Sequence, residues 1–210
     1  TVLRVEDARK IADRAREFKT AVLIDEAYHE FNLDLTCRDL INSHENVFVT
    51  RSLSKVLGIA SLRPGYVLSQ EENILQLRKI RGPYDPNMAA VAVSRGLKYQ
   101  ETVNGMMRYI REVMEEAKPR TEEFLIDLGM HVYPSGANFV LVDPSPLCSR
   151  EIYDFLKSYE IRDRKGELRY RGILVRPRSD PQNTFRLTIG TKKEMNLFMQ
   201  ALERFKTGRM

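Results

Sequence analysis

The segment after the apolar run Val47–Val49 holds the side chains best suited to chemistry. Lys55 stands there between two predicted strands, in a stretch that also contains Ser52, Ser54 and Arg63. We expect a lysine between two core strands to be buried, and burial favours the neutral amine, which is a nucleophile. Hydroxyl and guanidinium groups are the donors that proteins use to hold phosphate. The segment therefore predicts an imine-forming amine beside a phosphate site.

A second apolar run, Val22–Ile24, ends in Asp25, and Tyr28 follows three residues later. Sites in open α/β sheets lie at the carboxyl ends of parallel strands, where a carboxylate can pair with a protonated pyridine nitrogen. The two segments together suit pyridoxal phosphate, whose aldehyde and phosphate lie at different places on one ring. The simpler alternatives are that Lys55 extends from a strand end into water and that Asp25 caps the next element.

The segments around Asp25 and Lys55, with others further along, resemble the fold type I pyridoxal-phosphate-dependent aminotransferases of classes I and II. The resemblance is strongest to the histidinol-phosphate aminotransferase family. It runs from about Val22 to about Phe205, and each motif is weak alone but specific when all occur in order. The matching segments are Asp25–Phe31, Ser52–Lys55 with Gly58 and Leu62–Tyr66, Ser135–Phe139, Val175–Pro177 and Phe185–Thr191.

The resemblance implies a role for each of these residues. Lys55 would hold pyridoxal phosphate as an imine and act as the general base, while Asp25 keeps the ring nitrogen protonated. Arg186 lies on the polar side of a predicted strand, so the simpler alternative to a substrate-binding role is a surface ion pair. The remaining implied contacts are Tyr28 at the ring oxygen, Ser52, Ser54 and Arg63 at the phosphate, and Arg186, Asn138 and Arg176 at the substrate.

The implied reaction moves an amino group between a small amino donor, such as an amino acid or an amino-phosphate like histidinol phosphate, and 2-oxoglutarate. One alternative is decarboxylation of a phosphorylated amino acid of the threonine-phosphate type, which would use the same core residues. Another is a non-catalytic ligand-sensing domain of a regulator. The resemblance also implies a homodimer and an N-terminal segment, with a glycine-rich part of the phosphate site, that is truncated from this chain or forms a separate one.

The order of the predicted helices and strands indicates an α/β fold. We expect residues 1–118 to be the later part of a large cofactor-binding domain, like that of aspartate aminotransferase, with a mostly parallel sheet. Residues 119–210 would form a small C-terminal α/β domain. In that domain the run Thr184–Ile189 alternates between apolar and polar residues, which predicts a strand. Thr191 and Glu194 form a capping box that opens the last helix.

Composition limits the remaining possibilities. Hydrophobic residues make up 42% and charged residues 30% of the chain, as in a globular protein, and no run reaches the roughly 20 apolar residues of a membrane helix. The net charge of +5 is not accompanied by a nucleic-acid-binding motif, so we expect neither a nucleic-acid nor a membrane partner. Cys37 and Cys148 lie far apart, which fits a reducing, cytoplasmic compartment. The histidines lack metal-ligand spacing, and we expect no metal.

Overall fold

The structure is a computed structural model that describes residues 2–82, 87–162 and 165–208. It divides into two compact units, the first ending at Ile110 and the second beginning at Arg111. The sequence places the domain boundary between residues 118 and 119, further along the same run of helical residues.

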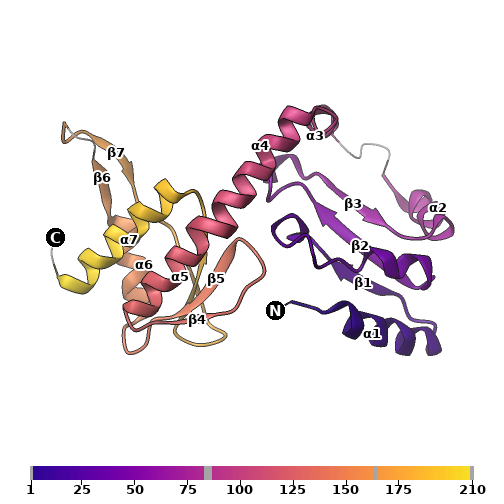
Figure 1. Cartoon of the computed structure of the whole chain (residues 1–210), viewed down its shortest axis with the longest axis horizontal. Coiled ribbons are helices and arrows are strands. Elements are labelled where there is room, and N and C mark those ends of the chain that lie inside the picture. Colours follow the sequence, from indigo (N-terminus) through magenta and orange to yellow (C-terminus); the bar gives the residue numbers. More distant parts are fainter. Residues whose placement is uncertain (1, 83–86, 163–164, 209–210) are drawn as a thin grey trace. The chain divides into compact units, whose positions relative to one another are not determined.

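The first unit contains a three-stranded sheet in the order β1 (Val22–Asp25), β2 (Val47–Ser52) and β3 (Gly65–Leu68) (Figure 1). Strands β1 and β2 are parallel, while β2 and β3 are antiparallel, so the described sheet is mixed rather than mostly parallel. A parallel pair needs a long connection. Here it contains two short 3-10 turns, His29–Phe31 and Arg38–Asn42.

Helix α1 (Val5–Glu17) covers one face of this sheet. The small residues of α1 allow the helix to approach the strands closely. The opposite face of the sheet carries exposed apolar side chains, among them Leu23 at 67% and Val67 at 38% exposure. One face is therefore a packed core and the other is uncovered by described residues of this unit. The buried core consists of Ala8, Ala12, Ile24, Cys37, Leu40, Val47 and Val49.

Three helices complete the first unit and lead toward the second. They are α2 (Glu71–Ile80), α3 (Met88–Gly96) and α4 (Gln100–Arg111). Asn87 caps α3, because its side-chain oxygen accepts the amide N–H of Ala90 at 2.9 Å. Among the described residues, no helix is both long and apolar enough to span a bilayer.

The helices of the second unit are α5 (Lys118–Asp127), α6 (Ser149–Ser158) and α7 (Lys192–Thr207), preceded by a π-helical stretch, Glu112–Ala117. The predicted capping box of α7 is confirmed, since Thr191 accepts from the amide of Glu194 and the Glu194 carboxylate accepts from the amide of Thr191. This arrangement satisfies two N–H groups that the helix itself leaves without partners.

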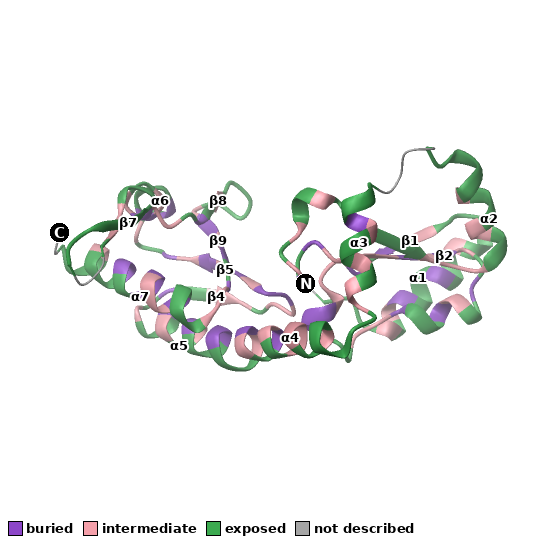
Figure 2. Ribbon diagram, turned by 90° about the horizontal axis from the view of Figure 1, so that it is seen from above, coloured by how far each residue is buried: buried purple, intermediate pink, exposed green. Residues whose placement is uncertain are grey.

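The main sheet of the second unit is antiparallel, in the order β4-β5-β9-β8, and a separate hairpin joins β6 to β7. The alternation predicted for β9 is confirmed: Phe185 and Leu187 are buried, whereas Arg186 and Thr188 are on the other face. Figure 2 shows where the buried residues lie along the strands and helices. The strands are β4 (His131–Tyr133), β5 (Phe139–Asp143), β6 (Glu160–Arg162), β7 (Leu168–Arg171), β8 (Arg176–Arg178) and β9 (Thr184–Thr188).

Candidate active site

The carboxyl ends of β1 and β2 bring the two predicted cofactor-binding segments together. Asp25 is the register partner of Thr50, and the amide of Glu26 continues the ladder by donating to the Thr50 carbonyl at 2.8 Å. Side chains alternate along a strand, so Asp25, Thr50 and Ser52 lie on the uncovered face of the sheet. The core residues of both strands lie on the opposite face.

Lys55 lies in the turn that follows β2, and its Nζ is 5.6 Å from the centre of the Tyr28 ring. This distance is within the range of a cation–π contact. The prediction that Lys55 is buried is wrong for the described residues, because its side chain is exposed. The turn gives the inward positions to Ser54 and Val56, at 8% and 5% exposure, and leaves the lysine between them on the outer side.

Asp25 is exposed at the end of β1, and its Oδ1 accepts the amide N–H of Ala27 at 3.0 Å. The turn-capping bond that the sequence offers as an alternative is therefore present. A carboxylate has about four lone-pair positions, so one such bond leaves capacity for another donor. The cap fixes the carboxylate at the strand end instead of competing with a ligand-binding role.

The residues predicted to bind phosphate surround the turn between β2 and β3. The Ser52 hydroxyl donates to the Pro64 carbonyl and accepts the Ser54 amide N–H, each at 3.2 Å. Because Pro64 directly follows Arg63, the first bond brings Ser52 close to the Arg63 turn. Arg63 has a left-handed backbone with φ 54° and an exposed guanidinium that donates to the Ala60 carbonyl at 3.4 Å. The structure thus groups Ser52 with the Arg63 turn, while Ser54 is buried beneath it.

The predicted substrate residues of the second unit also share a sheet. Arg176 and Arg186 are register partners on β8 and β9, so two guanidinium-bearing residues face each other across one strand pair. The Arg186 guanidinium lies over the Phe139 ring, 3.7 Å from its centre, which is a stacking contact rather than a simple surface location. Asn138 is buried, and its backbone carbonyl accepts the amide of Ile189 at 2.8 Å.

Lys118 is a buried residue in this unit that the sequence reasoning missed. It is 6% exposed, its Nζ donates to the Ser135 carbonyl, and the Glu122 carboxylate lies 3.9 Å away. Burial lowers the pKa of Lys118, and Glu122 partly opposes this effect. Since Ser135 lies in the loop between β4 and β5 that carries Asn138, Lys118 holds that loop. The only signal in the sequence is a lysine at the start of an otherwise ordinary helix.

Glu26 and Arg51 are two further charged residues that the sequence reasoning left unassigned. Beside the candidate site, Glu26 is buried and the Arg51 side chain is 11% exposed. Each occupies an inward position next to a predicted site residue, which is a signal that strand alternation could have provided.

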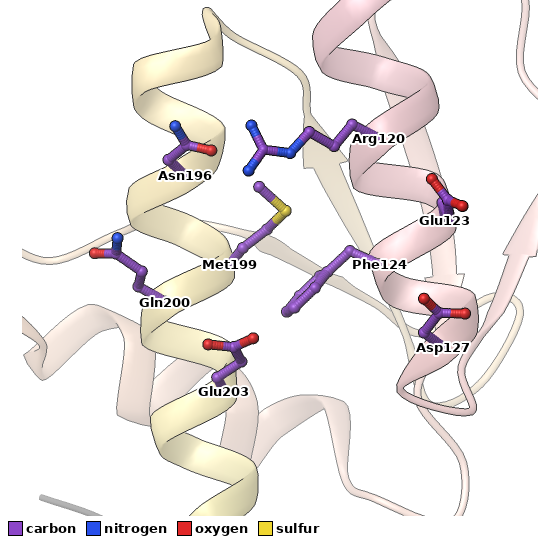
Figure 3. A pocket seen from close by; sticks show the side chains of 8 residues that line it. All are labelled: Arg120, Glu123, Phe124, Asp127, Asn196, Met199, Gln200 and Glu203. Carbon is purple, nitrogen blue, oxygen red and sulfur yellow. The ribbon is translucent and has the colours of Figure 1, made fainter.

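A shallow groove of about 420 Å³ lies between α5 and α7 (Figure 3). Phe124 and Met199 face it from the two helices, with acidic side chains around them. None of the predicted site residues lines this groove, so it lies outside the candidate site.

Comparisons with known proteins identify the fold and the family. A match to the family described as aminotransferase class I and II covers residues 1–202. The chain belongs to the class I and II aminotransferase family. A histidinol-phosphate aminotransferase from Geobacter sulfurreducens is 36% identical over 198 residues, which are 92% of this chain and 51% of that protein. This chain of the aminotransferase family spans about half the length of the curated relatives it matches.

Solved structures share the α/β fold of pyridoxal-phosphate-dependent transferases, as the sequence predicts. A decarboxylase from Sulfurospirillum multivorans matches with a TM-score of 0.76 at 26% identity, covering 97% of this chain and 57% of that one. A histidinol-phosphate aminotransferase from Sinorhizobium meliloti, solved with pyridoxal 5'-phosphate, matches with a TM-score of 0.72 at 24% identity, covering 99% and 54%.

Class I and II aminotransferases use pyridoxal phosphate, and the residues of this chain fit that cofactor. The Lys55 amine lies 5.6 Å from the centre of the Tyr28 ring, beside the end of β1. The Asp25 carboxylate at that strand end accepts one backbone amide and has lone pairs left for another donor. Hydroxyl and guanidinium donors occupy the adjoining turn. This donor set combines an amine for an aldehyde, an acid for a ring nitrogen and cationic donors for a phosphate.

Proposed function

We propose that the protein carrying this chain is a pyridoxal-phosphate-dependent aminotransferase that transfers an amino group between a donor resembling histidinol phosphate and 2-oxoglutarate. The observation that carries the proposal is the approach of Lys55 Nζ to the Tyr28 ring at 5.6 Å, next to the strand end that holds Asp25. The names of the curated relatives support the amino donor, since those relatives are histidinol-phosphate aminotransferases.

In this proposal each residue of the chain has a separate task. Lys55 would hold the cofactor and would act as the general base that takes a proton from the α-carbon of the substrate. Asp25 would keep a proton on the ring nitrogen, and Tyr28 would bind the ring oxygen. The cofactor, when bound, supplies an electron sink for the substrate's α-carbon. Ser52 and Arg63 hold the cofactor phosphate, with Ser54 beneath them.

Arg186 is the proposed ligand of the substrate's anionic group, with Arg176 and Asn138 in support. Arginine matches carboxylate and phosphate oxygens with two parallel N–H groups, and stacking on Phe139 fixes the plane of the guanidinium. Arg176 faces Arg186 across the strand pair. Two like charges at paired positions repel unless an anion lies near them, which favours an anionic substrate.

We also propose that a further protein segment covers the first unit, either from a longer chain or from a separate one, and that the assembly is a homodimer. Leu23 and Val67 are exposed on the sheet face that also carries Asp25. A groove of about 530 Å³ between β3 and α3 adds Tyr66 and Val91 to the accessible surface. Exposed apolar surface of this kind marks a contact with another segment. The free thiols of Cys37 and Cys148 support a reducing, cytoplasmic location.

The direct test uses the full-length protein that contains this chain, incubated with pyridoxal phosphate. We expect Lys55→Ala to abolish both the visible absorption of the lysine-bound cofactor and the formation of glutamate from histidinol phosphate and 2-oxoglutarate. The control is Lys10→Ala, because Lys10 is exposed on α1. Visible absorption that persists in Lys55→Ala, with cofactor still covalently bound, would assign the attachment to another residue.

The same assay separates the alternatives. Carbon dioxide release from threonine phosphate without glutamate formation would favour a decarboxylase, an activity named for one of the solved structures. Saturable binding of an amino acid without turnover of either kind would favour a ligand-sensing domain. Transamination of a non-phosphorylated amino acid alone would retain the reaction type and change the proposed donor.

A further inference from the structure

A buried ion pair connects the ends of β1 and β2 on the covered face of the sheet. Both Nε and Nη2 of Arg51 donate to Oε2 of Glu26, at 3.0 and 2.9 Å. The side chains are only 11% and 8% exposed, respectively. A guanidinium that donates two N–H groups to one carboxylate fixes the relative orientation of the two groups.

Neighbouring groups complete this network. The Thr36 hydroxyl donates to Glu26 at 3.1 Å and accepts an N–H of Arg51 at 2.8 Å, so it bridges both members of the pair. The remaining carboxylate oxygen of Glu26 accepts the backbone amide of Cys37. Tyr66 on β3 is the register partner of Arg51. The pair therefore connects β1, β2, β3 and the loop before Arg38.

The position of this network in the chain relates it to the candidate site. Glu26 directly follows Asp25, and Arg51 directly precedes Ser52. Because successive side chains of a strand point to opposite faces, the pair lies behind the residues that face the cofactor. Any change in the spacing of the pair alters the spacing of Asp25 and Ser52 on the other face.

Stability alone does not account for a buried pair at this place. Two charges lose their hydration on burial, and well-packed apolar side chains of similar volume often stabilise a core equally well or better. The core beside the pair is already apolar, with Ile24 and Val49 buried. What an ion pair adds to apolar contacts is direction, because its N–H groups and oxygens must align.

We propose that Glu26 and Arg51 are positioning residues that set the spacing and alignment of the two strand ends, and thereby of Asp25 relative to Lys55. This inference rests on the proposed cofactor site and adds two residues that do not touch the cofactor. It predicts that removing the pair changes the environment of the attached cofactor even when the charge balance of the core is kept.

The test compares Arg51→Met with the double variant Glu26→Gln/Arg51→Met in the full-length protein. The first leaves Glu26 without its cation, whereas the second removes both charges and leaves the net charge unchanged. The first measurement is amide hydrogen exchange in the absence of cofactor. The amide of Glu26, which donates to Thr50 across the strands, should exchange about tenfold faster or more in both variants, as expected when a bond of this kind is weakened.

The second measurement is the pH midpoint of the visible absorption band in the cofactor-loaded protein. A positioning role predicts a shift of about half a pH unit or more in both variants and in the same direction. Arg38→Met is the matched control, because Arg38 forms an exposed pair with Asp39 near the same loop, and it should leave both measurements unchanged. A wild-type midpoint in the double variant would show that only charge matters and would overturn the proposal.

Two further outcomes remain decisive. If Arg51→Met does not fold, Arg51→Lys carries the test, since an ammonium keeps the charge but cannot reproduce the two-pronged contact. An unchanged midpoint and unchanged exchange in that variant would overturn the positioning role. If the wild-type protein forms no visible band with pyridoxal phosphate, the proposed function fails, and the exchange experiment still decides whether the pair aligns the strand ends.

Discussion

Neighbouring residues near the candidate site have opposite surroundings. Asp25 is exposed while Glu26 is buried, and Ser52 is near the uncovered face while the Arg51 side chain, 11% exposed, lies on the opposite face. The alternation of strand side chains produces this division, because it sends one residue of each pair toward the uncovered face and the other toward the core. At this scale the residues proposed to bind the cofactor, Asp25 and Ser52, are adjacent in sequence to the residues proposed to position them, Glu26 and Arg51, and lie on the opposite face of the sheet.

Glu30 gives a prediction at the same scale. It is 8% exposed, and its Oε2 has no hydrogen-bond partner among the described residues. Burial is the main cause that raises the pKa of Glu30. A folded-state pKa above the unfolded one means that the folded protein binds more protons, so stability falls as pH rises from about 4.5 through the raised pKa. Glu30→Gln, which mimics the protonated acid, should remove this loss.

Chemical unfolding between pH 4 and 8 checks the prediction. The gain in unfolding free energy from Glu30→Gln should grow with pH, by about 1.4 kcal/mol for each unit of pKa shift. Glu45→Gln is the control, because Glu45 is exposed. A gain that stays constant across the pH range would mean that Glu30 is ionised at all these values.

Arg186 gives a second residue-scale prediction, which depends on the proposed function. Arg186→Lys keeps the positive charge but loses the flat guanidinium and its stacking on Phe139. We expect KM for an anionic amino donor to rise about 10- to 100-fold, the range for loss of one charge-assisted hydrogen bond. Arg178→Lys, on the adjacent strand and exposed, should leave KM unchanged. Steady-state kinetics with equal losses in both variants would contradict this role.

The sequence identifies residue types and their order better than their surroundings. Asp25, Lys55 and Arg186 could be selected because each stands at a fixed place in a matching motif. Their surroundings depend on which turn residues face inward, and this depends on contacts far away in sequence. The exposure of Lys55 shows the difference: its neighbours Ser54 and Val56 are the buried residues, and no local pattern distinguishes the three.

At the scale of elements, local patterns predict strands and helix starts well. The apolar runs that become β1 and β2, the alternation of β9 and the cap at Thr191 all depend on residues within a few positions of each other. The mixed sheet could not be predicted in this way, because the direction of β3 depends on its connection to β2. The π-helical stretch 112–117 was also missed, since its residues have the same apolar spacing as an α-helix.

Gly172, in the connection between β7 and β8, supports a prediction about its close contact with α6. Its φ is +89°, and a Cβ built there would lie 2.8 Å from the backbone carbonyl oxygen of Lys157. Gly172→Ala should therefore cost about 3 kcal/mol of unfolding free energy, the sum of a left-handed backbone and an overpacked contact.

Gly129 provides the matched comparison. It has φ +83° at the end of α5, and a Cβ there meets nothing within 4 Å. Gly129→Ala should cost only about 1 to 2 kcal/mol, because the backbone conformation alone is unfavourable. Urea denaturation of the two variants separates the cost of the backbone conformation from the cost of the overpacked contact. Equal losses of unfolding free energy would mean that the backbone near Lys157 moves to accept the Cβ without a loss of stability.

At the scale of the whole molecule, each unit has its own core, and the first has one uncovered sheet face. That face carries apolar residues and the predicted cofactor residues together, which the sequence alone could not show because it depends on what α1 covers. The curated relatives are about twice as long as this chain, which is consistent with a covering segment.

A substitution at Leu23 tests whether a further segment covers this face of the sheet. If it is buried in the full-length protein, Leu23→Lys should lower the unfolding free energy by about 2 to 5 kcal/mol, as for other losses of large buried side chains. Leu33→Lys is the control, because Leu33 is exposed in the loop after the first 3-10 turn. Thermal unfolding with the same midpoint for both variants would mean that the face carrying Leu23 stays in contact with water.

The π-helical stretch also has a consequence for how this protein can vary. Glu112 accepts the backbone amide of Lys192 at 3.0 Å, and Glu116 binds the Lys192 ammonium at 2.6 Å, so both acids meet the beginning of α7. Removing one residue between them would turn the two parts of the helix by about 100° relative to each other. One of the two contacts would then be lost whichever residue is deleted. Substitutions at the exposed Glu115 should be tolerated more easily than any change of length, so insertions and deletions in natural variants should avoid this stretch.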